Sequence, residues 1–375
     1  MSNIKKIAFL TGTRADFGKI KPLIQSVESE TGFEAHVFVT GMHLLEAYGY
    51  TLIEVERCGF KHISTFNNHT HEATMDLTLA KTITGFSNFI AETQPDLIVI
   101  HGDRVEALAG AIVGSLNNVL VAHIEGGELS GTIDELIRHA TSKMSHIHFV
   151  ANAQAKQLLE QMGELPGSIY TIGSPDIDVM FSSTLPNLSI VKDYYNIPFK
   201  DYAVAMFHPV TTEHEDMEDY AQQYVDALLQ SDKEYVVIYP NNDLGSQIIL
   251  KAYKRLENNP KFRIFPSIRF EYFLTLLKYA DFIIGNSSAG VREAPYYGIP
   301  TINIGTRQDN RAVLNSIINT NYTKDAIVKA ILKDKIKQPK ALDVFGNGKS
   351  ADAFIHSLKL DRFWEVNHQK QFRAI

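Results

Sequence analysis

The chain alternates short, almost continuous apolar runs with longer amphipathic segments. Segments such as Phe17–Glu30 and Ala153–Met162 are long enough to form helices. Apolar runs without polar alternation are typical of strands buried on both faces of a parallel sheet. The first half therefore predicts a parallel sheet covered by helices on both faces. Its apolar runs are Ile7–Thr11, Ala35–Thr40, Leu97–His101, Val119–Ile124, Ile147–Ala151 and Ile169–Ile172.

The same pattern resumes after a polar stretch at residues 182–201 that contains Pro186, Asn187 and Pro198. The later apolar runs are Ala203–Phe207, Tyr235–Tyr239, Phe262–Phe265, Phe282–Gly285 and Thr301–Ile304. We therefore predict two doubly wound, Rossmann-like α/β domains, at residues 1–181 and 202–350, joined by a linker at residues 182–201. Residues 351–375 are expected to form a helical segment that could pack back on either domain. We take packing on the N-terminal domain as the expectation.

Composition narrows the class of protein. The chain has 375 residues, of which 45% are hydrophobic and 21% charged, values that exclude intrinsic disorder. Lysine and arginine number 36 against 43 aspartates and glutamates, so no nucleic-acid partner is expected, although a local basic pocket can still hold phosphate. The single cysteine, Cys58, cannot form an internal disulfide and fits a reducing compartment.

No apolar run approaches the roughly 18 residues of a membrane helix, and no membrane partner is expected. The first run, Ile7 to Leu10, is also too short for the hydrophobic region of a signal peptide. We expect a cytoplasmic protein.

Ligands of open α/β sheets bind beyond the carboxyl ends of the strands, and polar residues collect at these ends here. The first strand is followed by a small-residue turn that carries Arg14, Asp16 and Lys19. Backbone amides at the start of the next helix, together with the two basic side chains, are suited to binding an anion. The alternative is a capped turn in which Thr13 or Asp16 serves as the N-cap.

Three carboxylates stand near the ends of two later strands. Asp103 and Arg104 follow one apolar run, and Glu125 ends the next, ahead of two glycines and Asp134. Carboxylates in such positions can act as general acids or bases. Asp103 and Asp134 could instead cap the helices that follow them, but this alternative explains Glu125 poorly. The cluster therefore favours a catalytic site.

The second half places a different set of polar residues after its strands. His208 follows the first strand, and a Gly-Asn-Ser-Ser segment that includes Ser287 and Ser288 precedes a predicted helix. Backbone amides and hydroxyls there could cradle a diphosphate, although serine is also a common N-cap. Glu293 lies about a turn and a half of helix further on, where a carboxylate could bind both ribose hydroxyls.

A metal site and a nucleophilic site are both disfavoured. The pairs His69/His71 and His146/His148 have i,i+2 spacing, but no compatible third ligand is visible near either pair. Neither Cys58 nor any serine lies in a recognisable nucleophile elbow. We expect no metal and no cofactor.

Taken together, the motifs resemble the hydrolysing UDP-N-acetylglucosamine 2-epimerases of bacterial sialic-acid and capsule biosynthesis. The resemblance spans residues 7 to about 311. It rests on the motifs Gly12–Asp16, Val39–His43, His101–Arg104, His123–Glu128, Ser130–Asp134, Ile137–His139, Phe207–Pro209, Gly285–Ser288 and Gly305–Gln308. Non-hydrolysing relatives usually carry a threonine-rich segment where this chain has Arg104, and they lack the Glu-Gly-Gly-Glu signature in this form, so the hydrolysing branch is favoured.

The resemblance implies a glycosyltransferase-B-like fold with two domains facing a central cleft, and a homodimer or homotetramer. The implied reaction converts UDP-N-acetylglucosamine and water to N-acetylmannosamine and UDP through a glycal. It needs acid and base groups on both faces of the sugar, and donors for the departing diphosphate. The acid and base groups would be Asp103, Glu125 and Asp134, and the diphosphate donors Arg14, His208, Ser287 and Ser288.

The resemblance also assigns residues to the nucleotide. Arg269 and Phe270 would lie near the uracil, and Glu293 would hold the ribose. Asn242 and Arg307 are further candidates for the same ligand. Three alternatives stay open: the same reaction on UDP-N,N'-diacetylbacillosamine in the legionaminic acid pathway, a UDP-sugar glycosyltransferase, and a non-catalytic nucleotide-binding module.

Overall fold

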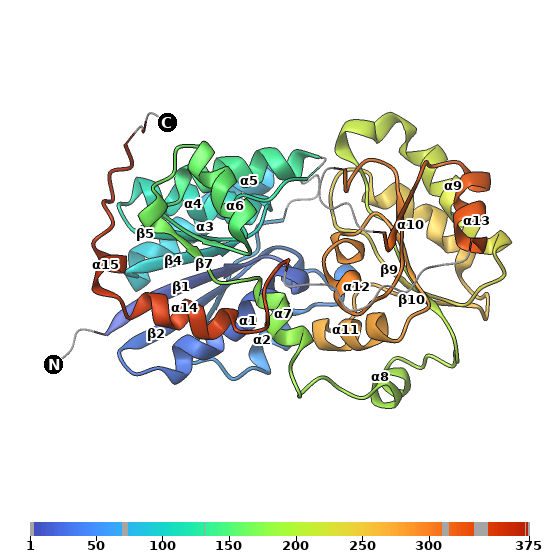
Figure 1. Cartoon of the computed structure of the whole chain (residues 1–375), viewed down its shortest axis with the longest axis horizontal. Helices are drawn as coiled ribbons and strands as arrows, with labels where there is room; N and C mark the ends of the chain where they lie inside the picture. The colour runs from blue at the N-terminus through green and yellow to red at the C-terminus, as the bar shows by residue number, and fades with distance from the viewer. Residues whose placement is uncertain are drawn as a thin grey trace. The chain divides into compact units, whose positions relative to one another are not determined.

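The computed structural model describes residues 4–69, 74–130, 132–309, 315–333, 344–371 and 373, and it divides into two units (Figure 1). The first unit comprises Met1–Glu128, Asp134–Ser182 and Asp343–Ile375, and the second comprises Leu129–Ile133 and Ser183–Leu342. Each unit is built around a parallel sheet with helices on both faces. The predicted fold class of two Rossmann-like α/β domains is confirmed.

The sheet of the first unit has seven strands in the order β3-β2-β1-β4-β5-β6-β7, and every recorded pairing is parallel. The order reverses between β1 and β4, which makes the carboxyl ends of these two strands the switch point where such sheets bind ligands. The strands are β1 (Lys5–Thr11), β2 (Phe33–Val39), β3 (His62–Thr65), β4 (Leu97–His101), β5 (Leu120–Ile124), β6 (Ile147–Val150) and β7 (Ile169–Thr171).

Helices cover both faces of this sheet because its strands are apolar on both sides. Phe9 and Val37 pack with residues of α1 on one face, whereas Leu10 and Phe38 pack with α3 and α4 on the other. The helices of the unit are α1 (Arg14–Ser29), α2 (Leu52–Glu56), α3 (Met75–Thr93), α4 (Val105–Leu116), α5 (Ile133–Met144), α6 (Ala153–Gln161), α7 (Pro175–Met180), α14 (Ser350–Leu358) and α15 (Asp361–Trp364). Short 3-10 turns add η1 (Gly41–Leu44), η2 (Glu46–Tyr48) and η3 (Pro166–Ser168).

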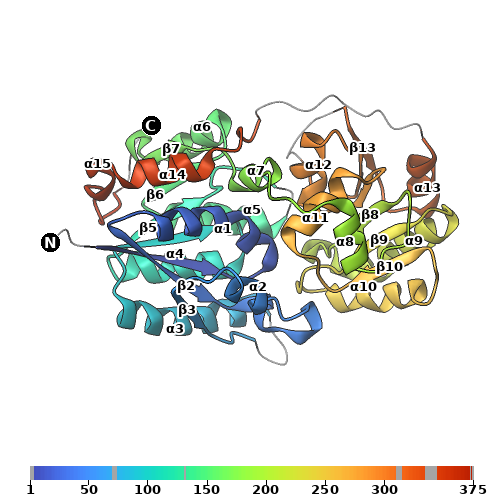
Figure 2. The same cartoon turned by 90° about the horizontal axis from the view of Figure 1, so that it is seen from below.

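The C-terminal segment packs on the first unit. Helix α14 lies beside α1 and α7 in both views (Figures 1 and 2), and Phe354 is fully buried in their shared core. Asp178 of α7 accepts hydrogen bonds from the amides of Ser350 (2.8 Å) and Ala351 (2.7 Å), which fixes the start of α14. Trp364 stacks against Phe33, with a centroid distance of 6.4 Å.

The sheet of the second unit has six strands in the order β10-β9-β8-β11-β12-β13, so its switch point lies between β8 and β11. The strands are β8 (Ala203–Met206), β9 (Tyr235–Ile238), β10 (Phe262–Phe265), β11 (Ile283–Gly285), β12 (Thr301–Ile304) and β13 (Ile317–Thr320). The helices are α8 (Leu188–Tyr194), α9 (Met217–Gln230), α10 (Ser246–Tyr253), α11 (Phe270–Lys278), α12 (Glu293–Tyr296) and α13 (Lys324–Leu332). The 3-10 turns are η4 (Thr211–Asp216), η5 (Lys254–Leu256) and η6 (Ser288–Gly290).

Two local expectations differ from the structure. Most of the stretch expected to be a linker, residues 182–201, belongs to the second unit and contains helix α8, which contacts α11. Pro186 and Asn187 mark the start of this helix, and the Pro186 carbonyl accepts a hydrogen bond from Thr275 at 2.9 Å. The segment after β11 forms the 3-10 turn η6 and then the separate short helix α12, instead of one continuous helix.

Within the part of the chain that the structure describes, no helix combines the length and apolarity needed to cross a bilayer.

Candidate active site

The carboxyl edge of the first sheet brings together three of the predicted residues. His101 and Ile124 are register partners on the neighbouring strands β4 and β5. Asp103 follows His101 by two residues and Glu125 follows Ile124 directly, so both carboxylates emerge at one edge of the sheet. Asp134 lies in the first turn of α5, the helix that follows β5. Asp103 and Glu125 share this edge because β4 and β5 are adjacent parallel strands.

Glu125 sits in a sharp turn. Its φ is +64°, a left-handed conformation that non-glycine residues rarely adopt and that is found most often at functional sites. Gly127 has a φ of +76°, and a Cβ atom there would come within 2.2 Å of the carbonyl oxygen of Ala155. A side chain at Gly127 would therefore displace the turn that presents Glu125.

The Glu125 carboxylate is almost fully buried and has polar partners on both oxygens. Ser174 donates a hydrogen bond to Oε1 at 2.5 Å, and Lys19 Nζ lies 3.7 Å from the same oxygen. His101 Nε2 lies 3.3 Å from Oε2. Lys19 Nζ is also 3.6 Å from Asp176, so one buried ammonium lies between two carboxylates. These contacts fix the carboxylate in one orientation.

Arg138 of α5 connects the loops that follow β4 and β5. Its guanidinium forms an ion pair with Asp103 and donates a hydrogen bond to the main-chain carbonyl of Glu125 at 2.7 Å. It also lies 3.7 Å from Glu128. Arg138 is only 1% exposed, so this charge depends on its protein partners. Asp134 precedes Arg138 by four residues and therefore lies on the same face of α5.

Two buried histidines of the first unit are neutral: His123, which supports the loop after β4, and His43, which contacts Thr11 and Thr51. His123 Nε2 donates to the Gly102 carbonyl at 2.7 Å, and its Nδ1 lies 3.0 Å from Ser142 Oγ. Burial lowers the pKa of His123 to about 3. Burial, together with the charge of Arg14, also lowers the pKa of His43 to about 3. Both rings act as fixed hydrogen-bonding groups at neutral pH.

The turn after β1 is a capping box. The Thr13 side chain accepts a hydrogen bond from the Asp16 amide at 3.2 Å, and Asp16 accepts from the amides of Gly12 (3.0 Å) and Thr13. Burial raises the pKa of Asp16, against the opposing effect of these hydrogen bonds and of one from Thr11. The turn therefore has the capped geometry that was the alternative to anion binding, with Thr13 as the N-cap. Arg14 is the first residue of α1.

Other predicted residues of the first unit have protein partners as well. Arg104, the N-cap of α4, donates from Nε to Glu106 at 3.3 Å. Lys19, predicted to bind an anion, is 8% exposed and contacts carboxylates instead. Asp103 contacts Arg138 and does not occupy the N-cap position of α4.

In the second unit, two loops at the switch point are joined directly. The His208 amide donates to Asn286 Oδ1 at 2.6 Å, and Asn286 Nδ2 donates to the His208 carbonyl at 2.9 Å. The Asn241 amide donates to His208 Nδ1 at 3.0 Å, so the neutral ring carries its proton on Nε2. A Cβ atom at Gly285, where φ is +133°, would come within 1.8 Å of the Met206 carbonyl oxygen.

The remaining nucleotide candidates belong to the same unit. Arg307 and Gln308 donate to the Asn286 carbonyl at 3.3 Å and 2.8 Å. Ser287 caps the turn η6, which begins at Ser288. Glu293 is the first residue of α12 and is 3% exposed.

Arg269 and Phe270 lie at the start of α11. The Arg269 guanidinium packs over the rings of Tyr194 (5.0 Å) and Tyr272 (5.4 Å), and its amide donates to Tyr195 Oη at 2.9 Å. Phe270 is buried. Asn242 lies in the loop between β9 and α10, next to the residue whose amide contacts His208.

Several residues of the site were not predicted as site residues. Arg138 could have been found from its i+4 spacing to Asp134. Ser174 and Asp176 follow an apolar run in a Gly-Ser-Pro-Asp segment, which was the available signal. Asn286 belongs to the Gly285–Ser288 motif, and no role was predicted for its side chain.

Of the two histidine pairs considered for zinc, the structure describes both members of only one, His146 and His148. His146 and His148 have other partners: His146 Nε2 contacts the His368 carbonyl at 3.0 Å, and His148 Nε2 contacts Glu164 at 3.0 Å. His71, from the other pair, lies outside the described residues.

Similar proteins extend these observations. The family described as UDP-N-acetylglucosamine 2-epimerase matches residues 25–359. A UDP-N-acetylglucosamine 2-epimerase of Neisseria meningitidis serogroup B is 50% identical over 373 residues, covering 98% of this chain and 99% of that protein. The polysialic acid biosynthesis protein P7 of Escherichia coli is 34% identical, covering 88% of this chain and 85% of that protein.

Two further similarities are to a relative named for another nucleotide sugar and to a solved structure. A UDP-N,N'-diacetylbacillosamine 2-epimerase (hydrolyzing) of Legionella pneumophila is 31% identical, covering 95% of this chain and 96% of that protein. The crystal structure of Methanocaldococcus jannaschii UDP-GlcNAc 2-epimerase in complex with UDP-GlcNAc and UDP aligns with a TM-score of 0.79 at 23% identity, over 94% of this chain and 99% of that chain, which shows the same fold. On its sequence matches, this chain belongs to the UDP-N-acetylglucosamine 2-epimerase family.

Proposed function

We propose that this enzyme converts UDP-N-acetylglucosamine and water to N-acetylmannosamine and UDP, with inversion at C2 of the sugar. The observation that carries the proposal is the cluster at the carboxyl edge of the first sheet. Asp103 pairs with Arg138, which also holds the Glu125 carbonyl, and Asp134 lies one helical turn before Arg138. We assign the acid and base groups that the reaction needs to these three carboxylates.

The first half of the reaction is an elimination. The bond between C1 and the UDP oxygen breaks, and the electron pair leaves with UDP. A carboxylate takes the proton from C2, and a double bond forms between C1 and C2 to give a glycal. Positive charge develops at C1 as UDP departs, so nearby carboxylates stabilise the transition state.

The second half is a hydration of that double bond. Water adds its oxygen to C1, and C2 receives a proton on the face opposite to the one that lost it. Inversion therefore needs a proton acceptor on one face and a donor on the other, which a single carboxylate cannot supply. We assign the two roles to members of the set Asp103, Glu125 and Asp134. The route requires no metal and no redox cofactor.

We assign binding of the departing diphosphate to side chains that carry N–H or O–H donors. His208 presents Nε2–H, because its Nδ1 accepts the Asn241 amide. Ser287, Ser288 and Arg307 offer hydroxyl and guanidinium donors, and Arg14 adds a positive charge at the start of α1. Glu293 is assigned to the ribose, and Arg269, Phe270 and Asn242 to the nucleotide. Lys19, which contacts Glu125 and Asp176, is assigned to positioning Glu125.

The hydrolysing outcome is supported by two observations. The Legionella relative, at 31% identity, is named as hydrolyzing. The chain also carries Arg104 and the Glu-Gly-Gly-Glu segment, which resemble the hydrolysing branch. The similarity to polysialic acid biosynthesis protein P7 supports a place at the first step of sialic-acid formation for capsule polysaccharide. We also propose that the enzyme is cytoplasmic and forms a homo-oligomer. Light scattering of the purified chain would test the oligomeric state.

Proton NMR of the reaction in D2O tests the proposal. The expected products are UDP and N-acetylmannosamine with deuterium at C2, since the proton returned to C2 comes from solvent. A UDP-linked sugar epimerised at C2, with no sugar released, would overturn the hydrolysing assignment. UDP release only in the presence of a sugar acceptor would indicate a glycosyltransferase, and binding of UDP without turnover would indicate a non-catalytic module.

Substitution of the carboxylates tests the site. Asp103→Asn, Glu125→Gln and Asp134→Asn should each lower kcat by about 10²–10⁴-fold while UDP binding, measured by calorimetry, is retained. Glu135→Gln is the matched control, because Glu135 is adjacent to Asp134 on α5, is partly exposed and forms an ion pair with His139 at 3.4 Å. Full activity of all three carboxylate variants would refute the assignment.

The second candidate substrate is UDP-N,N'-diacetylbacillosamine, which is named for the Legionella relative. The two sugars differ at C4, where an acetamido group replaces the hydroxyl, and at C6, which lacks its hydroxyl. Parallel incubations with both nucleotide sugars, followed by NMR identification of the released sugar, decide between them. The 50% identity to the Neisseria enzyme supports UDP-N-acetylglucosamine.

A further inference from the structure

A second cluster of polar side chains lies at the outer edge of the first sheet, away from the proposed active site. Glu34 and His36 are two residues apart on β2, so both side chains project from the same face of the sheet. His62 on the edge strand β3 is the register partner of His36 and therefore shares that face. Among the described residues, this is the group of three histidine, cysteine or acidic side chains whose ligand atoms converge.

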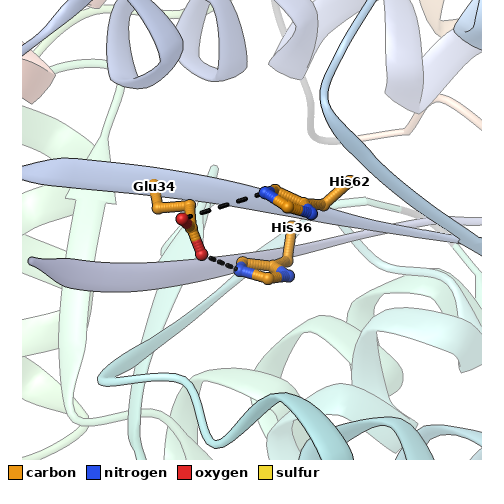
Figure 3. A group of neighbouring side chains, drawn as sticks. All are labelled: Glu34, His36 and His62. Carbon is orange, nitrogen blue, oxygen red and sulfur yellow. Dashed lines mark hydrogen bonds and ion pairs between the residues drawn. The ribbon is translucent and has the colours of Figure 1, made fainter.

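The three side chains point at one another (Figure 3). The imidazole rings of His36 and His62 are stacked, with centroids 4.5 Å apart and an interplanar angle of 15°. Nε2 of His36 lies 2.6 Å from Glu34 Oε1, and Nε2 of His62 lies 3.8 Å from Glu34 Oε2. Two imidazole nitrogens are thus directed at one carboxylate.

The spacing is close to what a bound metal ion requires. The ligand atoms lie within 4.8 Å of one another. Ligands about 2.0–2.1 Å from a tetrahedral ion are about 3.3 Å apart. The most distant pair therefore needs to close by about 1.5 Å at most, and His36 Nε2 and Glu34 Oε1, 2.6 Å apart, need to open by about 0.7 Å. The His62 side chain is 45% exposed and can rotate to do so, whereas His36 is only 11% exposed and provides a fixed ligand.

The charges around the cluster favour a cation. The Glu34 carboxylate faces both imidazole nitrogens, and imidazole and carboxylate are ligands that bind divalent transition metals. Lys6 is the register partner of Glu34 on β1, and its ammonium donates to the Thr93 carbonyl at 3.1 Å. The side-chain exposures of 45% for His62 and 32% for Glu34 leave room for water to complete the coordination.

We propose that Glu34, His36 and His62 form a binding site for one divalent transition-metal ion, with zinc as the best match. Two imidazoles and one carboxylate suit zinc, nickel and copper, whereas magnesium prefers oxygen ligands alone. The fourth ligand is water.

The ion connects the edge strand β3 to its only neighbour in the sheet, β2. A strand paired on one side is held weakly, so a metal bridge between the two strands stabilises that edge. His36 lies three residues, about 10 Å, before the carboxyl end of β2, and β5 is three strands away, about 14 Å. The site therefore stabilises the fold and leaves turnover unchanged.

Metal titration of the full chain, without a polyhistidine tag and after treatment with a chelator, tests the proposal. Calorimetry with Zn²⁺ should give one saturable site per chain, and hydrogen exchange of the β3 amides should slow when Zn²⁺ is added. His62→Ala and Glu34→Gln should each weaken binding by at least about tenfold. His356→Ala, which removes an exposed histidine of α14, should bind as the unmodified chain does.

A second measurement is independent of the variants. Anomalous diffraction at the zinc absorption edge, from crystals of the unmodified chain grown with Zn²⁺, should place the ion between Glu34, His36 and His62. The absence of saturable binding, undiminished binding by both variants, or anomalous density only at another position would each overturn the proposal. Epimerase turnover should be equal in the chelated and zinc-loaded protein, and a dependence of turnover on the ion would refute the purely stabilising role.

Discussion

The side-chain amide of Asn286 is hydrogen-bonded in both directions to the main chain of His208. Oδ1 accepts from the His208 amide at 2.6 Å, and Nδ2 donates to the His208 carbonyl at 2.9 Å. The two residues follow β8 and β11, the strands on either side of the switch point in the second sheet. Asn286 therefore acts as a spacer that sets the backbone position of His208, and with it the direction of the imidazole ring.

Removing this spacer should weaken nucleotide binding. Asn286→Ala leaves two buried main-chain groups of His208 without these partners and frees the loop to shift, so UDP affinity should fall by about tenfold, or 1.4 kcal/mol. Calorimetric titration with UDP measures the change. Asn319→Ala is the control, because it removes a hydrogen bond of 2.8 Å to Asn303 in the same sheet at a position remote from His208 in the strand order. Equal losses in the two variants would contradict the spacer role.

The ring orientation of His208 makes a second prediction. Because Nδ1 accepts the Asn241 amide, the donor of the neutral ring is Nε2–H. The amide nitrogen of glutamine reaches roughly the position of Nε2, whereas that of asparagine reaches roughly the position of Nδ1. UDP affinity should therefore fall less in His208→Gln than in His208→Asn. A larger loss in the glutamine variant would show that Nδ1, and not Nε2, faces the ligand.

The sequence predicted the strands that contain a continuous apolar run, including the edge strands β7 and β10. The run Leu97–His101 coincides with β4, because a strand buried on both faces is apolar throughout. The strands β3 (His62–Thr65) and β13 (Ile317–Thr320) were not predicted. Both lie at sheet edges, are partly exposed and include polar residues, so they lack the apolar run that identifies a buried strand.

The active-site residues divide in a similar way. Asp103 and Glu125 were predictable from the local sequence, because Asp103 follows a strand end and Gly102, and Glu125 follows a strand end and precedes two glycines. The partners of Glu125 were not, since Ser174 is 49 residues away and meets it only once β5, β6 and β7 are paired in the sheet. Contacts of this kind depend on strand order, which a single sequence does not specify.

Arg138 should be essential for turnover and for stability. Arg138→Met removes the ion pair to Asp103 and the hydrogen bond to the Glu125 carbonyl, so the Asp103 carboxylate and the turn that carries Glu125 each lose a fixed contact. We expect kcat to fall by about 10²-fold, as for small displacements of catalytic groups, and the free energy of unfolding to fall by about 3 kcal/mol or more. His139→Ala, which alters a partly exposed neighbour on α5, should change neither by much. Activity of Arg138→Met near that of the unmodified enzyme would exclude the positioning role.

Ser174 should affect catalysis without affecting nucleotide binding. Ser174→Ala removes the hydrogen bond of 2.5 Å to Glu125 Oε1 but leaves the carboxylate itself in place. The expected result is a kcat lower by about tenfold, equivalent to one hydrogen bond to a charged group, with an unchanged UDP dissociation constant. Ser168→Ala serves as the comparison, because Ser168 is also buried but bonds only to the Leu165 carbonyl. A parallel loss of UDP affinity in Ser174→Ala would point to a different role.

His123 makes the stability of the first unit depend on pH. Burial lowers the folded-state pKa to about 3, whereas the ring has a pKa of about 6.5 in the unfolded chain. Below pH 6.5 the unfolded chain therefore binds a proton that the folded chain excludes, and stability falls as the pH decreases. Between pH 7.5 and 5.5 this single group lowers the free energy of unfolding by about 1 kcal/mol.

Replacing the ring should remove that dependence. His123→Gln lowers stability at pH 7.5, because the hydrogen bonds to Gly102 and Ser142 are disturbed, but its further loss on going to pH 5.5 should be smaller than in the unmodified chain by about 1 kcal/mol. Urea unfolding followed by tryptophan fluorescence measures this in the first unit alone, since Trp364 is the one tryptophan of the chain and packs on β2. Ser142→Ala is the matched control, because it removes a partner of His123 but keeps the ring, and it should lose as much stability between the two pH values as the unmodified chain. An unchanged pH dependence in His123→Gln would show that protonation of this histidine does not govern the acid sensitivity of the fold.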